Sequence, residues 1–149
     1  MNIRVATSQF ATIKDNFESN LNKAIKLIED AAKENVDILL LQELFLDNYF
    51  CSTKNDKFFN LAIDFPSNPM FEKLSNICKN KNISLPISFF QQDAGKYFNS
   101  LVMIDSNGEY SEVYNKSHIP EGIGYNEKYY FEKGKTGFMV FDTPKAKVG

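Results

Sequence analysis

The sequence predicts an α/β protein in which helices alternate with parallel strands. Residues 36–42 include four consecutive apolar side chains, the pattern of a strand that is buried on both faces of a sheet. Residues 15–35 and 70–78 carry apolar side chains three and four positions apart, as amphipathic helices do. A strand-like run at 3–10 precedes the first helix, and another at 83–90 follows the second. This order predicts two consecutive βαβ units.

The two helices have recognisable starts and apolar faces. Asp15 or Asn16 can cap the first helix, because a short polar side chain accepts hydrogen bonds from the free amide groups of the first turn. Pro66 and Ser67 precede the second helix. The apolar stripes expected to face the sheet are Phe17, Leu21, Ala24, Ile28 and Ala31 in the first helix and Met70, Phe71, Leu74, Ile77 and Cys78 in the second.

The last third of the chain is expected to add antiparallel strands. Asn107-Gly108 lies between strand-like runs at 97–105 and 109–115, and this dipeptide favours a tight hairpin turn. The segments expected outside these strands and helices are an aromatic loop with a short helix over 44–60, a long loop over 116–135, a short strand over 138–141, a turn over 142–147 and the start of another strand at 148–149.

Composition and charge exclude several classes of protein. The 149 residues are 43% hydrophobic, enough to bury the core of one domain. Seventeen basic and 19 acidic residues give a net charge of −2, so no general nucleic-acid surface is expected. No apolar run approaches the roughly 20 residues that span a membrane, and no signal peptide precedes the first strand. Cys51, Cys78 and His118 are too widely spaced for a zinc site or a disulfide framework, which indicates a reducing, cytoplasmic compartment.

Glu43 is the most informative single residue, because it directly follows the strand predicted to be buried. Ligands of α/β sheets bind beyond the carboxyl ends of the strands. A carboxylate there is partly desolvated, which raises its pKa and suits it to proton transfer. The alternative is a solvated glutamate in an ordinary loop.

Further polar residues lie in the loops. Lys116 follows the second hairpin strand, where a fixed positive charge can stabilise an oxyanion, although a surface lysine is the alternative. His118 is either a proton carrier or a hydrogen-bonding loop residue. Cys78 continues the apolar stripe of the second helix, and Cys51 lies in an aromatic loop. Neither cysteine has the strand-to-turn setting of an exposed nucleophile.

Taken together, these segments resemble the nitrilase superfamily of carbon–nitrogen hydrolases. Residues 39–45 (LLLQELF) are similar to the block that carries the family's catalytic glutamate, and residues 114–120 (YNKSHIP) to the block that carries its lysine. Asn115 replaces the arginine of many relatives, and Gln42 replaces the common proline. The segments that resemble the N-carbamoylputrescine-hydrolysing branch are 85–90 (LPISFF), 97–100 (YFNS), 116–120 (KSHIP), 124–131 (GYNEKYYF) and 134–138 (GKTGF).

The resemblance implies a thiol amidohydrolase. A cysteine thiolate would attack the carbamoyl carbon, and the products would be putrescine, carbon dioxide and ammonia. Glu43 matches the general base, Lys116 the lysine that stabilises the oxyanion, and Glu127 a further glutamate that orients the group. No metal or organic cofactor is implied. Assemblies of dimers or larger are implied.

The resemblance also implies an αββα sandwich of roughly twice this length. A domain of that length is larger than a single small domain. Residues 1–149 would then be the N-terminal part of one carbon–nitrogen hydrolase domain, ending just before the strand that carries the nucleophilic cysteine. Cys51 and Cys78 match no family nucleophile. The chain alone is therefore expected to be inactive. A non-catalytic fragment or binding domain, whose apolar sheet face is covered by self-association, is the alternative.

The expected substrate is a small molecule. An N-carbamoyl amino acid carries a carboxylate, which calls for Arg or Lys, whereas carbamoylputrescine carries an ammonium that favours carboxylates and aromatic faces. Asp47 and Tyr49 in the loop after Glu43, with Glu121 as a second carboxylate, favour the cationic substrate. His118 is also assigned to substrate binding. Another N-carbamoyl compound or amide remains the alternative.

Overall fold

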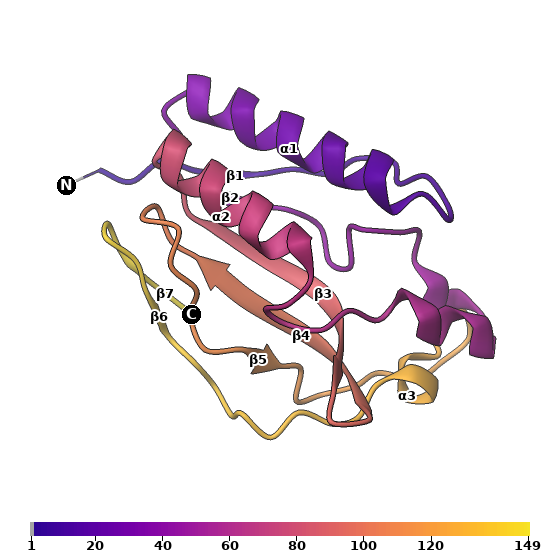
Figure 1. Cartoon of the computed structure of the whole chain (residues 1–149). Coiled ribbons are helices and arrows are strands. Elements are labelled where there is room, and N and C mark those ends of the chain that lie inside the picture. The colour runs from indigo at the N-terminus through magenta and orange to yellow at the C-terminus, as the bar shows by residue number, and fades with distance from the viewer. Residues whose placement is uncertain (1) are drawn as a thin grey trace.

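The computed structural model describes residues 2–149 and consists of one layer of helices packed on one face of a sheet (Figure 1). Its elements are β1 (Val5–Thr7), α1 (Phe17–Lys33), β2 (Ile38–Leu40), the 3₁₀ helices η1 (Phe50–Ser52) and η2 (Asp56–Leu61), α2 (Pro69–Lys81), β3 (Leu85–Asp93), β4 (Lys96–Ile104), β5 (Tyr114–Asn115), α3 (Glu127–Tyr130), β6 (Phe141–Asp142) and β7 (Lys147–Val148). The predicted α/β class is confirmed.

The strands follow the order β1, β2, β3, β4, β5. β1 pairs with β2 in parallel, and a single parallel bridge between Ile38 and Ser84 joins β2 to the start of β3. β3, β4 and β5 are successive antiparallel neighbours. Both predicted βαβ units are therefore present, the first through α1 and the second through α2. β6 and β7 form a separate antiparallel pair.

The helix boundaries follow from their caps. The Asn16 side chain accepts a hydrogen bond from the amide of Ser19 and so caps α1, as one of the two predicted candidates. Asn68 caps α2 in the same way, and Pro69 occupies its first turn, where no amide donor is required. Asn82 ends α2 in the left-handed conformation. Both helices lie side by side above the sheet (Figure 1).

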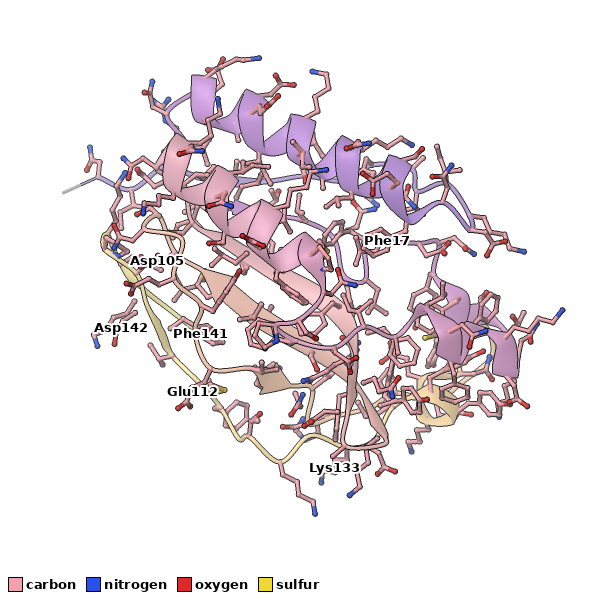
Figure 2. All side chains as sticks on the ribbon, in the orientation of Figure 1. Phe17, Asp105, Glu112, Lys133, Phe141 and Asp142 are labelled. Atoms are coloured by element: carbon pink, nitrogen blue, oxygen red, sulfur yellow. The ribbon has the colours of Figure 1, made fainter. Side chains whose placement is uncertain are left out.

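The main core lies between the two helices and the sheet, where their side chains meet (Figure 2). The apolar stripes predicted for the helices face inward, because residues three and four apart share one side of a helix. The fully buried side chains of this core include Ala24, Ile28, Phe71, Leu74, Cys78, Ile83, Leu85, Ile87, Phe89, Val102 and Ile104. Cys78 is thus a core residue, in agreement with its place on the helical stripe.

The opposite face of β1 and β2 is less covered. Val5 and Leu40 are exposed, whereas Leu39, which points to the helices, is buried. Successive residues of a strand point to opposite faces, so the helices protect only one of them. The prediction that this strand is buried on both faces is therefore wrong at Leu40, which is 42% exposed. Within residues 2–149, no helix has the length and apolar character needed to cross a membrane.

Several predicted boundaries also change. The strand expected over 138–141 is wrong: Phe138 is 98% exposed, and the pairing begins at Phe141, with Val148 as its partner. Figure 2 shows Phe141 and Asp142 on the hairpin at the edge of the molecule. The first strand is restricted to Val5–Thr7, because only these residues pair with β2. The hairpin strand expected over 109–115 is regular only at Tyr114–Asn115.

One tight turn was not anticipated by the sequence. Asp93 pairs with Lys96, so Ala94 and Gly95 alone connect β3 to β4. Both residues have positive φ, which is the conformation of a hairpin turn whose twist matches that of the strands. Alanine at the first of these positions is unusual, and the antiparallel pairing of two nine-residue strands holds it there.

Candidate active site

Glu43 lies just beyond the carboxyl end of β2, where the sequence predicted it. The next residue, Leu44, has a φ of 52°, which is the left-handed region that a leucine rarely adopts. This turn directs the Leu44 amide to the hydroxyl oxygen of Ser88 on β3, at 3.2 Å. Backbone strain of this kind is commonly found at functional sites. The chain therefore turns sharply at Glu43 and remains bonded to the sheet.

Lys116 directly follows β5, and its peptide is held on both sides. Its amide donates to the carbonyl oxygen of Asn99 on β4, at 2.9 Å, and its own carbonyl accepts from the amide of Gly134, also at 2.9 Å. The preceding residue, Asn115, donates its side-chain amide to Gln91 on β3 and to Ser100 on β4. These bonds fix the backbone from which the lysine side chain extends.

Glu127 is the first residue of α3, and its neighbours attach this short helix to η1. Asn126 donates its backbone amide and its side-chain amide to the carbonyl oxygen of Cys51, at 2.7 and 3.1 Å. Tyr130 donates its hydroxyl to the carbonyl oxygen of Thr53, at 2.6 Å. Tyr130 also packs against Phe50, with ring centroids 5.1 Å apart. In this arrangement Glu127 is 2% exposed.

The three charged side chains converge on one point. The Lys116 ammonium lies 3.0 Å from Glu43 Oε1 and 2.9 Å from Glu127 Oε2. The Tyr49 hydroxyl donates to Glu127 Oε1 at 2.8 Å. The Asn99 amide donates to Glu43 Oε1 at 2.7 Å. One cation thus bridges two carboxylates, each of which also accepts a hydrogen bond from a neutral donor.

These contacts determine the charge state of the group. Burial of the Lys116 ammonium acts to lower its pKa, but the hydrogen bonds to Glu127 and Glu43 outweigh this effect, and the pKa is raised above its ordinary value. Burial, together with the hydrogen bond to Glu127, also raises the pKa of Tyr49. At neutral pH the site therefore holds an ammonium and a neutral phenol.

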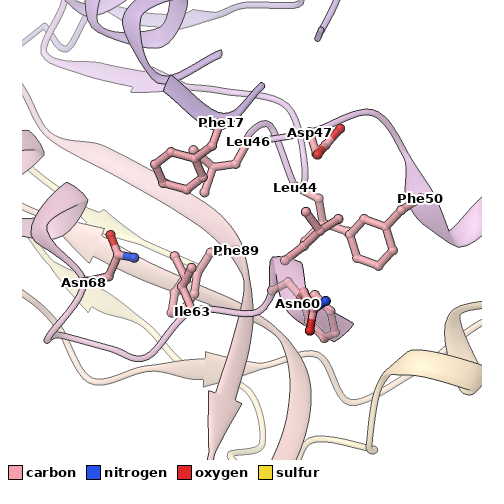
Figure 3. A pocket seen from close by; sticks show the side chains of 11 residues that line it. Phe17, Leu44, Leu46, Asp47, Phe50, Asn60, Ile63, Asn68 and Phe89 are labelled. Atoms are coloured by element: carbon pink, nitrogen blue, oxygen red, sulfur yellow. The ribbon is translucent and has the colours of Figure 1, made fainter. Parts of the chain in front are cut away.

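The other residues assigned to substrate binding lie elsewhere. The Asp47 carboxylate accepts hydrogen bonds from the backbone amides of Asp15 and Asn48, at 3.1 and 2.7 Å. It lines an apolar cavity between α1 and β3 (Figure 3), whereas Glu43 and Lys116 line a separate groove. The position of Asp47 favours a structural role for this carboxylate.

Glu121 and His118 are also outside the convergent group. Glu121 pairs with the Lys54 ammonium at 3.2 Å and accepts the backbone amide of Lys128 at 3.3 Å, so an internal cation already contacts it. His118 is exposed and lines a shallow groove beside Lys128. Tyr49 is the member of this set that contacts the charged group directly.

Neither cysteine is placed as a nucleophile. Cys51 is buried, and this burial, reinforced by the charges of Glu127 and Glu43, raises the pKa of its thiol. Burial raises the pKa of Cys78 to about 12. A thiol with a raised pKa carries little thiolate at neutral pH. Over the described range 2–149, no cluster of three or more His, Cys, Asp or Glu side chains is arranged to hold a metal ion.

We expect Cys51 and Cys78 to resist modification in the folded protein. At pH 8 an aromatic disulfide reagent should leave both unlabelled for hours, because buried thiols of raised pKa are poor nucleophiles. Adding guanidinium chloride should expose both within minutes. Peptide mapping by mass spectrometry provides the measurement. Rapid labelling of Cys51 in the native state would contradict the burial described above.

The sequence reasoning did not identify Asn99 and Ser88 as parts of the site. Asn99 is 3% exposed and contacts Glu43 from β4, while Ser88 lies between apolar residues in the first part of β3. A signal was present in the sequence: a polar residue within an apolar strand requires a partner, since an unpaired buried polar group is costly. The identity of that partner depended on the strand register.

Gly134 should tolerate no side chain. A Cβ atom there would lie 2.1 Å from the carbonyl oxygen of Asn115, so the backbone that carries Lys116 would have to move. We expect Gly134→Ala to lower the free energy of unfolding by about 1–3 kcal/mol, the usual penalty of overpacking. Lys133→Ala, at the exposed neighbouring position, is the matched control and should leave the free energy of unfolding nearly unchanged. Urea unfolding of both variants tests this, and equal midpoints would refute it.

Comparison with known proteins agrees with this architecture. Residues 4–149 match the sequence profile of the carbon-nitrogen hydrolase family. The chain is 40% identical over 147 residues to N-carbamoylputrescine amidase of Solanum lycopersicum, covering 99% of this chain and 49% of that protein. It is 45% identical over 148 residues to citrullinase of Francisella tularensis, covering 99% and 51% respectively. The chain thus spans about half the length of the curated relatives it matches.

Solved structures give the same result for the fold. The crystal structure of a carbon-nitrogen hydrolase from Helicobacter pylori G27 superposes with a TM-score of 0.85 at 32% identity, covering 97% of this chain and 50% of that chain. An amidase from Nesterenkonia sp. superposes with a TM-score of 0.77 at 20% identity, covering 94% of this chain and 51% of that one. With its family profile matched over residues 4–149, the chain belongs to the carbon-nitrogen hydrolase family.

Proposed function

We propose that the protein containing this chain hydrolyses a terminal ureido group, with N-carbamoylputrescine as the substrate and putrescine, carbon dioxide and ammonia as the products. The observation that carries this proposal is the Lys116 ammonium held 3.0 Å from Glu43 and 2.9 Å from Glu127. An ammonium and a carboxylate side by side are the groups that an acyl transfer to a thiol requires.

The contacts of each side chain support a distinct role. An ammonium has three N–H donors, and the two carboxylates engage two of them. The third remains for the oxygen of the carbamoyl group, which becomes negative when a nucleophile adds to the carbon. Glu43, which is half-exposed beside the groove, accepts the proton of the attacking thiol and later that of water. Buried Glu127 holds Lys116 in place.

The nucleophile is proposed to be a cysteine outside residues 1–149. Cys51 and Cys78 are both buried with raised pKa values, which argues against either of them. The matched relatives are about twice as long as this chain. Residues 1–149 would accordingly be the N-terminal part of a single hydrolase domain that supplies the base and the oxyanion lysine, and they would be inactive alone.

The choice of a ureido substrate follows from the similar proteins. One is named for N-carbamoylputrescine and another for citrulline. Both compounds carry a terminal ureido group on a short carbon chain that also bears an amine. The Tyr49 hydroxyl donates to Glu127, which also contacts the Lys116 ammonium, and this tyrosine is 39% exposed, so it can contact such a chain or its ammonium.

The first test is the intact mass of the purified protein followed by an ammonia-release assay. A protein of about twice the 17.1 kDa of these residues should release ammonia from N-carbamoylputrescine, whereas the 149-residue chain alone should release none. Citrulline and a simple aliphatic amide are the comparison substrates. Faster ammonia release from either of these compounds would replace N-carbamoylputrescine as the assigned substrate. Tight binding of carbamoylputrescine by the large protein without any ammonia release would favour a non-catalytic binding domain.

A further inference from the structure

The two carboxylates of the site differ in how completely they are bonded. Glu127 Oε1 accepts the Tyr49 hydroxyl, and Glu127 Oε2 accepts the Lys116 ammonium. Glu43 Oε1 accepts from both Asn99 and Lys116. Among the residues that the structure describes, no donor is bonded to Glu43 Oε2. This atom is therefore the one carboxylate oxygen of the group that is left for a proton.

Asn99 is held so that its amide presents a donor to Glu43. The Leu44 amide donates to Ser88 Oγ at 3.2 Å, which leaves the hydroxyl proton of Ser88 free to point elsewhere. That proton points to Asn99 Oδ1 over a long 3.5 Å contact. The oxygen of the Asn99 side chain thus faces Ser88, and its nitrogen faces Glu43.

The backbone of Asn99 contacts the same site. Its carbonyl oxygen accepts the amide of Lys116 at 2.9 Å, so one residue of β4 bonds both the lysine backbone and the glutamate side chain. Asn99 is buried within a strand of nine residues that pairs on both sides. A donor on such a rigid element fixes the orientation of a half-exposed carboxylate.

We infer that Asn99 is a positioning residue that binds Glu43 through Oε1 and so makes Oε2 the proton-accepting atom. The inference rests on the proposed hydrolase function. The ionisable groups around this contact are Glu43, Lys116, Glu127 and Tyr49, together with Tyr114, which lines the same groove as Glu43 and Asn99. Asn99 has no proton to exchange at neutral pH, so it acts on the reaction only through Glu43.

The test uses two substitutions at this position in the complete protein. Asn99→Ala removes the donor and should lower kcat by about 10- to 100-fold with KM nearly unchanged, as for loss of a hydrogen bond to a charged group. Asn99→Asp keeps the shape but places a carboxylate against Glu43. Its kcat relative to the wild type should be lowest at pH 8 and rise at least 10-fold towards pH 5, because the introduced carboxyl group can donate a hydrogen bond again once it is protonated. A ratio independent of pH would overturn the inference.

A double-mutant comparison separates positioning from general damage. In a Glu43→Gln background, Asn99→Ala should reduce the residual rate by less than threefold, because the group on which it acts is gone. Multiplicative losses would mean that Asn99 does not act through Glu43. Asn20→Ala removes another fully buried asparagine, bonded to Ile13 and Leu46, and should lower stability without changing the pH dependence.

A measurement without turnover keeps this result distinct from the proposed function. The side-chain amide NMR signal of Asn99 should shift in Glu43→Gln and remain unchanged in Glu112→Gln, which alters an exposed glutamate. If the wild type hydrolyses no ureide while this shift is observed, the proposed function fails and the contact stands. If the Asn99 signal does not respond to Glu43→Gln, the inference fails whatever the activity.

Discussion

Replacing Lys116 by methionine is expected to abolish hydrolysis, with a decrease in kcat of at least about 1,000-fold. Methionine keeps most of the side-chain volume but removes the ammonium that bridges Glu43 and Glu127. Glu127 would then be a buried carboxylate without a cation, which costs about 3–5 kcal/mol when one partner of a buried pair is removed. Ammonia release and thermal unfolding of the complete protein measure the two effects.

Two controls distinguish lost chemistry from lost folding. Lys133→Met changes an exposed lysine and should leave both the rate and the melting temperature close to those of the wild type. The double variant Lys116→Met with Glu127→Gln removes the unpaired charge and should regain stability without regaining activity. Recovery of the rate in that double variant would contradict the assignment of Lys116 to the oxyanion.

The charge of Lys116 also sets an expected pH dependence. Its folded-state pKa is raised above the ordinary 10.5, so the ion pair stabilises the fold fully below pH 10.5 and is lost as the pH rises through the folded-state pKa. Between pH 6 and 9 Lys116 should therefore stay protonated, and a plot of kcat against pH should show no change that is due to its titration.

Replacing Glu43 by glutamine is expected to lower kcat by about 100- to 10,000-fold, the range for removal of a general base. The effect on stability should be small, because the Glu43 side chain is 46% exposed and an ion pair of this kind contributes about 0–1 kcal/mol. Ammonia release at saturating substrate and urea unfolding are the measurements.

Glu127→Gln provides the internal contrast. Its carboxylate is buried and bonds both Tyr49 and Lys116, so its replacement should lower stability as well as rate. Glu112→Gln, at an exposed position, should change neither. If Glu43→Gln and Glu127→Gln reduced stability equally, the division between a proton-accepting and a structural glutamate would be wrong.

Local sequence patterns were sufficient for helices α1 and α2 and for the main order of the strands, but not for the short helix α3, which lies in the segment predicted as a long loop. The stripe from Phe17 to Ala31 defines the buried face of α1, because its period of three and four matches the helix whatever packs against it. The apolar run before Glu43 likewise marks the end of a strand, and in an α/β sheet that end is where ligands bind. The strand expected at Phe138 failed because an apolar segment forms a strand only where a partner strand is available.

The sequence by itself determined the fold class, the helical faces and the candidates Glu43, Lys116 and Glu127. The tertiary structure alone decided that Lys116, 73 positions after Glu43, bonds it and Glu127 together, and that Asn99 and Tyr49 supply the neutral donors. It also decided that the Asp47 carboxylate accepts the backbone amides of Asp15 and Asn48. The physical reason is that periodicity and propensity act over one or two turns of chain, whereas the partner of a polar group is fixed by strand register and by the packing of distant loops.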